Sequence, residues 1–148
     1  MVVFDTWSAA SATLHGYCRA VDEGRVEDFV ALYLPDGIHD DGIRLRQGHA
    51  DIRALVVGVI ARYDATSHHL SNIVLAPTPD GDLSSRSHIY AWHRRAGHPD
   101  LEVWGQYQDI LRQQHGRWLI ARRMLYVAGT RGLERNPGFR PVPRISPP

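Results

Sequence analysis

The second half of the chain contains three long runs, LSSRSHIYAWHRR at residues 83–95, LEVWGQYQDILRQ at 101–113 and WLIARRMLYV at 118–127. All three are rich in β-branched and aromatic residues, and a fourth run of the same character precedes them at 69–77. Turn residues separate the runs, as in Ala-Gly-His-Pro at 96–99, so each run is predicted to be a strand that pairs with the next. The stretch therefore predicts a long antiparallel meander.

Helical patterns occupy the part of the chain before these strands. Apolar residues recur at helical spacing over 6–22 and 48–63, and a shorter helix is predicted over 26–34. Pro-Asp-Gly at 35–37 predicts a turn that ends this short helix, and a small hairpin is expected over 38–46 around Asp-Gly. Helices followed by an antiparallel meander indicate an α+β fold. Long strands that curl around helices would form a cone with a deep apolar cavity.

The composition of the chain changes after residue 128. Residues 129–148 contain five Pro, three Gly, four Arg and one Glu, without periodicity. We therefore expect one domain over 1–128 and an arm or disordered tail over 129–148. With four Arg and one Glu, the tail has a net charge of +3. Because the whole chain has a net charge of +1, residues 1–128 have a net charge of −2. A domain with this charge is not expected to bind nucleic acid.

The residue types that are absent exclude several kinds of chemistry. All 17 basic residues are Arg, and without Lys there can be no Schiff-base, pyridoxal-phosphate or P-loop lysine. No cofactor is expected. No apolar stretch is long enough for a membrane span, and the first ten residues do not resemble a signal peptide. Cys18 is the only cysteine, which excludes an internal disulfide and fits a cytoplasmic location.

Six short phrases of the sequence, taken together, carry a family resemblance. They are Tyr-Cys-Arg-Ala-Val-Asp-Glu-Gly-Arg at 17–25, Leu-Tyr-Leu-Pro-Asp-Gly at 32–37, Gly-x-x-x-Ile at 48–52, His-His-Leu-Ser-Asn at 68–72, Gly-x-Tyr-x-Asp at 105–109 and Gly-Arg-Trp-x-Ile-x-x-Arg at 116–123. In this order they resemble the SnoaL-like branch of the nuclear transport factor 2-like superfamily. The resemblance implies three N-terminal helices packed on a strongly curved, mainly antiparallel sheet.

This superfamily includes enzymes of several kinds as well as binding modules without activity. Its enzymes include steroid isomerases, scytalone dehydratase, a dehydrochlorinase, bile-acid dehydratases, polyketide cyclases and epoxide hydrolases. The fold alone therefore does not decide the function, which depends on the residues of the cavity.

Asp22 is the first candidate for catalysis. Helical spacing puts it on one face with Cys18 and Leu14, which is otherwise apolar, and a carboxylate buried there would need a partner. In the dehydrochlorinase and bile-acid dehydratase members, an Asp–His pair abstracts a proton. The resemblance assigns these roles to Asp22 and His68, with the imidazole as the base. Strand alternation allows only one of His68 and His69 to point inward, and the resemblance favours His68.

The resemblance implies two further catalytic residues. Tyr17 would donate a hydrogen bond to a developing oxyanion, and Arg123 would hold an anionic or leaving group. The candidate substrate-binding residues are His88, Trp104, Tyr107, Leu14 and Cys18. Alternation puts Trp104 and Tyr107 on opposite faces of one strand, and it leaves open which face of the 83–95 strand is concave.

The remaining polar clusters are interpreted without a functional role. No metal site is expected, because the Asp-Gly turn explains the cluster of His39, Asp40 and Asp41. His93, His98 and His115 lie near turns and are expected at the surface. Cys18 is expected to be an inert buried hydrophobe.

These features predict a small-molecule lyase or isomerase that acts without a cofactor, with dehydration as the first choice of reaction. The substrate would be small and apolar, of a polyketide or steroid-like kind. The alternative is a cone that binds a ligand or partner protein and catalyses nothing. An epoxide hydrolase is a third possibility, for which only Asp22, Asp109 and Arg123 are available. The resemblance also implies a homo-oligomer, a dimer or trimer.

Overall fold

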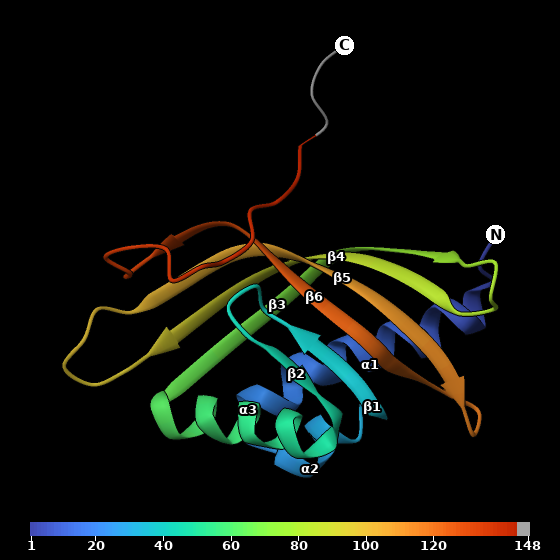
Figure 1. Cartoon of the computed structure of the whole chain (residues 1–148), viewed down its shortest axis with the longest axis horizontal. Helices are drawn as coiled ribbons and strands as arrows, with labels where there is room; N and C mark the ends of the chain where they lie inside the picture. The colour runs from blue at the N-terminus through green and yellow to red at the C-terminus, as the bar shows by residue number, and fades with distance from the viewer. Residues whose placement is uncertain (145–148) are drawn as a thin grey trace.

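The computed structural model describes residues 1–144 and, within them, one six-stranded sheet and three helices. Along the chain the elements are α1 (Phe4–Asp22), α2 (Val26–Val30), β1 (Tyr33–Asp40), β2 (Leu45–Gln47), α3 (Gly48–Arg62), β3 (Ala65–Pro77), β4 (Leu83–Arg94), β5 (Leu101–Gln114) and β6 (Arg117–Arg131). The strand order is β2-β1-β6-β5-β4-β3, with β1 and β6 parallel and the other neighbours antiparallel. The long strands bend over the helices, which lie together on one side of the sheet (Figure 1).

Helix α1 forms because one of its faces is apolar along its whole length. Ala10, Leu14, Tyr17 and Val21 are buried at helical spacing against the sheet. Gly24, two residues beyond the helix, adopts a φ of 68°, the left-handed conformation that commonly ends helices. The helix therefore ends at Asp22, beside the first residues of β3.

Strand alternation defines the inner face of the sheet. In β4 the buried residues alternate with exposed or half-buried ones, and the same holds in the first part of β5. The inner face of these two strands is formed by Ser85, Ser87, Ile89, Ala91, His93, Val103, Gly105, Tyr107, Asp109 and Leu111. Register shifts at Ser71/Val74, Trp104/Gly105 and Ile110/Leu111 interrupt the pairing, and such bulges bend and twist strands. The bulges thus give the sheet the curvature that a cavity requires.

Two expectations for the region around residues 26–40 are wrong. The short helix ends at Val30 rather than residue 34, and Pro35-Asp36-Gly37 lies inside β1 instead of forming a turn. Pairing with β6 outweighs the local turn preference: Tyr33 pairs with Ile120, and the Ile120 N–H donates to Leu32 O over 2.8 Å. A register shift between Tyr33 and Ile38 absorbs the irregular residues.

The C-terminal segment is ordered beyond the domain boundary expected at residue 128. β6 continues to Arg131, and the chain then returns along the sheet, where Val127 N–H donates to Arg140 O over 2.7 Å. Arg140 Nη2 forms a 2.9 Å ion pair with Asp40 Oδ2 at the end of β1. These pairings, not composition, hold residues that have no periodicity of their own. Residues 145–148 of the expected tail lie outside the described part of the chain.

Candidate active site

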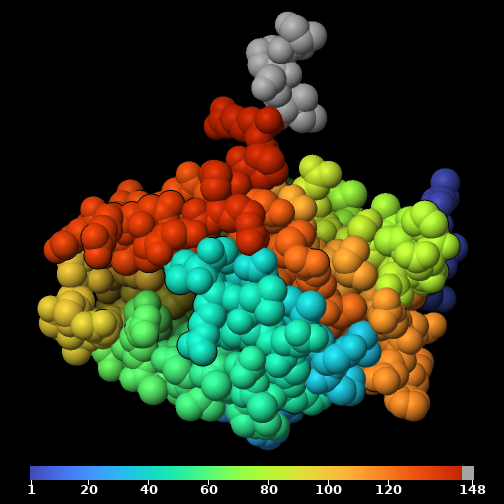
Figure 2. All heavy atoms as spheres, viewed as in Figure 1, coloured from blue at the N-terminus to red at the C-terminus, as the bar shows by residue number. Residues whose placement is uncertain are grey.

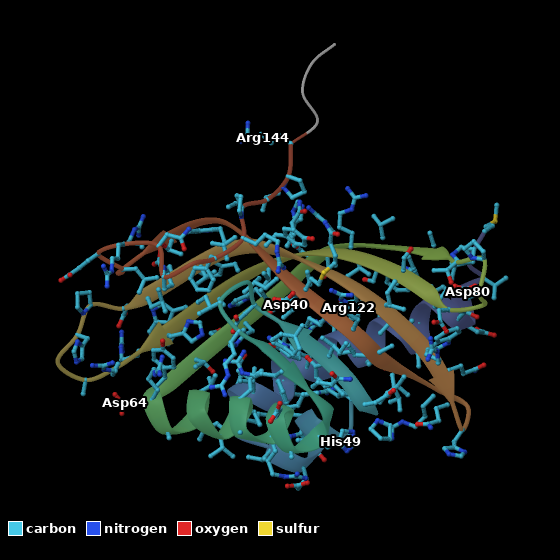
Figure 3. The ribbon with its side chains drawn as sticks, viewed as in Figure 1. Asp40, His49, Asp64, Asp80, Arg122 and Arg144 are labelled. Atoms are coloured by element: carbon cyan, nitrogen blue, oxygen red, sulfur yellow. The ribbon has the colours of Figure 1, made fainter. Side chains whose placement is uncertain are left out.

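A cavity of about 410 Å³ lies between the inner face of the sheet, α1 and α3. Most of its lining is apolar or aromatic. The lining residues are Tyr17, Val21, Phe29, His39, Asp41, Ile43, Arg44, Arg46, Leu55, Val56, Val59, Arg62, Tyr63, His68, Ile89, Ala91, His93, Leu101, Val103, Tyr107, Leu125 and Phe139. The surface is hollowed where the end of α3, the loop after β1, the β4–β5 connection and the C-terminal segment meet (Figure 2). Helix α3, which borders the cavity, runs from the region of His49, in its first turn, toward Asp64, which lies two residues beyond its last residue (Figure 3).

Asp22 and His68 form a hydrogen-bonded pair beside this cavity. Asp22 Oδ1 lies 2.6 Å from His68 Nδ1, and Asp22 Oδ2 accepts the His68 backbone N–H over 2.8 Å. The Thr66 hydroxyl also donates to Oδ1, over 2.7 Å. The side chains of His68 and Asp22 are only 8% and 23% exposed. The end of α1 and the start of β3 thus fix both the ring and the carboxylate.

The pleat of β3 settles which of the two adjacent histidines faces the cavity. His68 lines the cavity, whereas His69 is exposed on the outer face, where its ring lies 5.7 Å from that of Tyr90. The alternation expected from the sequence therefore separates the two rings, and the inward one is His68.

The electrostatics of the pair favour an ionised Asp22. Burial raises the pKa of its carboxyl, but the hydrogen bonds from His68 and Thr66 outweigh burial and hold the pKa below its ordinary value of 3.8. Since an ionised carboxylate only accepts hydrogen bonds, Nδ1 of His68 must carry the proton. Nε2 of a neutral His68 then has a free lone pair, and no described residue hydrogen-bonds to it. A neutral imidazole held in this way can act as a base.

His93 is a cavity residue that the sequence interpretation missed. It was expected at the surface, yet it is buried, and its ring lies edge-on to His68 with 5.2 Å between the centroids. Burial, and then the neighbouring His68, lower the pKa of His93 to about 4, so it is neutral near pH 7. The sequence did hold a signal for its burial. His93 follows Ile89 and Ala91 at alternate positions, so it shares one face of β4 with two apolar residues.

Arg123 is completely buried and paired, behind the cavity rather than on its wall. Its Nε and Nη2 donate to the two Asp109 carboxylate oxygens over 2.8 and 3.0 Å. Its guanidinium carbon lies 4.2 Å from the ring centre of Tyr17 and 4.0 Å from that of Tyr107, and both rings line the cavity. Burial alone would lower the pKa of Arg123, but Asp109 raises it well above the ordinary range. Arg123 is therefore a permanent cation under two tyrosines.

The two tyrosines keep their protons. Burial raises the pKa of Tyr17 and, by more, that of Tyr107, and the two hydroxyl oxygens lie 3.5 Å apart. Tyr107 donates its hydroxyl hydrogen to the Tyr17 oxygen, so the Tyr17 O–H is the one left free to donate to an oxygen atom in the cavity.

Four of the expected substrate-binding residues do not line the cavity. His88 and Trp104 point to the outer face, because the inner face of β4 and β5 is the one that carries Ile89 and Tyr107. Leu14 and Cys18 are buried in the core between α1 and the sheet. Burial raises the pKa of the Cys18 thiol to about 11, which leaves it uncharged. Of the five residues expected, Tyr107 is the one that reaches the cavity.

His39 also lines the cavity. It is buried, and its Nδ1 lies 2.9 Å from the Tyr33 hydroxyl in a hydrogen bond. Burial, and then Arg123, lower the pKa of His39 to about 3, so it is neutral. Asp40 and Asp41 are held by Arg140 and Arg46, and residues 1–144 contain no group of three or more His, Cys, Asp or Glu side chains that could hold a metal. Within the same residues, no helix is long and apolar enough to cross a membrane.

Comparison with known proteins shows the family. A model of the SnoaL-like domain matches residues 8–124. A crystal structure assigned as a scytalone dehydratase from Novosphingobium aromaticivorans is similar, with a TM-score of 0.87, 25% identity and 95% of each chain covered. No curated protein sequence matches.

More distant structures share the fold alone. The hexachlorocyclohexane dehydrochlorinase LinA-type3 from Novosphingobium barchaimii has a TM-score of 0.78 and 15% identity, over 95% of this chain and 96% of that one. ActVI-ORFA from Streptomyces coelicolor has a TM-score of 0.71 and 15% identity, over 84% and 96%. The six-stranded sheet with three helices thus matches the nuclear transport factor 2-like fold, and the chain belongs to the SnoaL-like domain family.

Proposed function

We propose that this protein is a lyase or isomerase that acts on a small, largely apolar molecule without a cofactor, with dehydration as the most favoured reaction. The observation that carries the proposal is the 2.6 Å contact of His68 Nδ1 with Asp22 Oδ1 beside an apolar cavity. A family that includes dehydratases, isomerases and dehydrochlorinases supports the class of reaction.

In the proposed reaction, His68 Nε2 removes a proton from a carbon next to a carbonyl or a leaving group. The positive charge that forms on the imidazole is stabilised by the Asp22 carboxylate. In a dehydration, the electron pair of the broken C–H bond forms the new double bond and expels the hydroxyl group, which leaves as water with the proton from His68. In an isomerisation, His68 returns the same proton to another carbon.

Tyr17 would stabilise the charge that develops on the substrate by donating its O–H, while it accepts a hydrogen bond from Tyr107. Their hydroxyls are protonated, lie close together on the cavity wall and have the Arg123 cation directly beneath their rings. Donors fixed in a buried site contribute more than donors in water, because they need no reorganisation during the reaction. Arg123 thus acts through the two tyrosines, and we propose it as a positioning residue instead of a group that touches the substrate.

The test is turnover by purified protein of β-hydroxy ketones and unsaturated ketones of increasing size, followed by product analysis. For any substrate found, His68→Ala and Asp22→Asn should each lower kcat by about 10²- to 10⁴-fold. The matched control is His69→Ala, which removes the adjacent outward ring and should keep full activity. Full activity of both His68→Ala and Asp22→Asn would contradict the proposal.

The second candidate is a binding module without activity. It is favoured by the cavity itself, because 410 Å³ of largely apolar space can hold a small ligand without any chemistry. Tight binding of a ligand that the protein never converts, unaffected by Asp22→Asn, would favour this candidate. An epoxide hydrolase receives less support, because Asp109 is bound to Arg123 and does not line the cavity.

We also propose a homo-oligomer, a dimer or trimer, located in the cytoplasm. The outer face of the sheet supports the first proposal, since it exposes Trp104 beside Tyr90. Light scattering of the purified protein, compared with Trp104→Glu, tests it: the wild type should have two or three times the mass of one chain. The unpaired Cys18 supports the second proposal.

A further inference from the structure

The mouth of the cavity has a cationic wall that the proposed chemistry does not use. A smaller hollow of about 190 Å³ shares six lining residues with the main cavity, namely Arg44, Arg46, Leu55, Val59, Arg62 and Tyr63. Three of the six are arginines, which come from the loop after β1, from β2 and from the end of α3. Arg44 and Arg62 are exposed, so this wall is the entrance and the apolar residues lie deeper.

The acidic side chains at the entrance neutralise only part of this wall, because Arg44, Arg46 and Arg62 face two carboxylates, those of Asp41 and Asp51. Asp41 Oδ2 pairs with Arg46 over 2.7 Å, while Asp41 Oδ1 accepts the backbone N–H groups of Ile43 and Arg44 over 2.9 and 2.7 Å. Both Asp41 oxygens are therefore occupied. Asp51, in the smaller hollow, accepts the Gln47 N–H.

The other two arginines have no such partner. Among residues 1–144, no ion pair includes Arg44 or Arg62. Residues 1–128 have a net charge of −2, so the cationic entrance is a local feature and not part of a generally basic surface. Two unpaired guanidinium groups beside an apolar cavity match a ligand with one anionic end and one apolar end.

We propose that Arg44 and Arg62 bind an anionic group of the substrate, a carboxylate or another oxyanion, while its apolar part fills the cavity. This inference rests on the proposed function and narrows its substrate class from small apolar molecules to small apolar acids. The acid group stays at the entrance, which orients the molecule so that its apolar end reaches toward His68 and His93. The same charges attract the anion from solution, an effect that salt weakens.

The test compares two fluorescent probes that share one apolar skeleton. The probes are 8-anilinonaphthalene-1-sulfonate, which is an anion, and N-phenyl-1-naphthylamine, which lacks the sulfonate and is neutral. We expect the wild type to bind the anionic probe about tenfold more tightly than the neutral one at low salt. The difference should shrink as salt is added, because the groups at the entrance are exposed.

Variants assign the preference to the two arginines. The double variant Arg44→Gln/Arg62→Gln should lose about tenfold in affinity for the anionic probe and keep its affinity for the neutral one. The double variant Arg44→Lys/Arg62→Lys, which keeps both positive charges, should retain most of the wild-type affinity for the anionic probe. The matched control is Arg86→Gln, an exposed arginine on the outer face of β4, which should bind both probes as the wild type does. Leu55→Trp, which narrows the passage, should weaken both probes and thus show that they occupy the cavity.

The binding test is independent of catalysis. Equal affinities of the wild type for both probes, or an unchanged affinity of the Gln double variant for the anionic probe, would overturn the inference and leave the proposed lyase or isomerase intact. Conversely, if the probe preference is found but Asp22→Asn and His68→Ala keep full activity, the proposed function fails and the anion subsite stands.

Discussion

The Asp22 carboxylate joins the end of α1 to the start of β3 and orients the His68 ring. Asp22 ends α1, and it accepts hydrogen bonds from the His68 ring, the His68 backbone and Thr66. Its ionisation fixes the hydrogen of a neutral His68 ring on Nδ1 and leaves a free lone pair on Nε2. The pair thus has an orientation that neither residue would have alone.

A second residue, His93, should make the stability of the protein depend on pH. Its pKa is lowered to about 4 from an ordinary value of 6.5. Between these pH values the unfolded chain binds a proton that the folded protein does not, so the free energy of unfolding should fall as the pH drops from about 6.5 to 4. Urea unfolding at a series of pH values measures this slope.

His93→Gln should reduce the slope, because it removes one buried ring that must stay neutral. His39, whose pKa is lowered to about 3, should account for part of the slope that is left. The control is His15→Gln, on the exposed face of α1, which should keep the wild-type slope. A slope in His93→Gln that equals the wild-type slope would contradict the burial of this ring.

Among the elements, β5 depends on one glycine. A Cβ atom at Gly105 would lie 2.3 Å from the Tyr126 carbonyl oxygen on β6, where the register shifts. Gly105→Ala should therefore destabilise the protein by about 1–3 kcal/mol, measured by chemical unfolding. The matched control is Gly129→Ala on β6, where a Cβ would meet nothing within 4 Å, and it should change stability by less than about 0.5 kcal/mol.

The C-terminal segment is a second element whose position can be tested. Arg140 anchors it through Asp40, and its carbonyl accepts the Val127 N–H. Arg140→Ala should loosen the segment and speed hydrogen exchange at the Val127 amide by several-fold, whereas Arg135→Ala, at an exposed position, should not. Equal exchange in all three proteins would show that the ion pair does not hold the segment.

Sequence patterns predicted the long elements better than the short ones. The α1 stripe and the alternation in β4 and β5 are long enough to define a face, and the resemblance carried by Asp22 and His68 predicted a pair that does lie within hydrogen-bonding distance. Tyr33 and Pro35-Asp36-Gly37 were mispredicted because their structure depends on β6, more than 80 residues away in the sequence. His88 and Trp104 were placed in the cavity because alternation shows which residues share a face but not which face is concave.

In the whole molecule, the Arg123–Asp109 pair joins the strands and the helix that surround the candidate active site. It connects β5 to β6 and lies against Tyr17 of α1, and both side chains are 0% exposed. Asp109→Asn would leave the Arg123 charge buried without its partner, so it should destabilise the protein by about 3–5 kcal/mol. Thermal or urea unfolding measures this loss of stability. A loss below about 1 kcal/mol would mean that water hydrates the Arg123 guanidinium in the variant.

The protonation of the His68 ring tests the proposed Asp22–His68 pair most directly, because nitrogen-15 NMR measures it without any substrate. In the neutral form of the ring, the wild type should show its one hydrogen on Nδ1 and a bare Nε2, and Asp22→Asn should lose this preference. A neutral ring with its hydrogen on Nε2, or one that the Asp22→Asn change leaves unaltered, would contradict the proposed role of the pair.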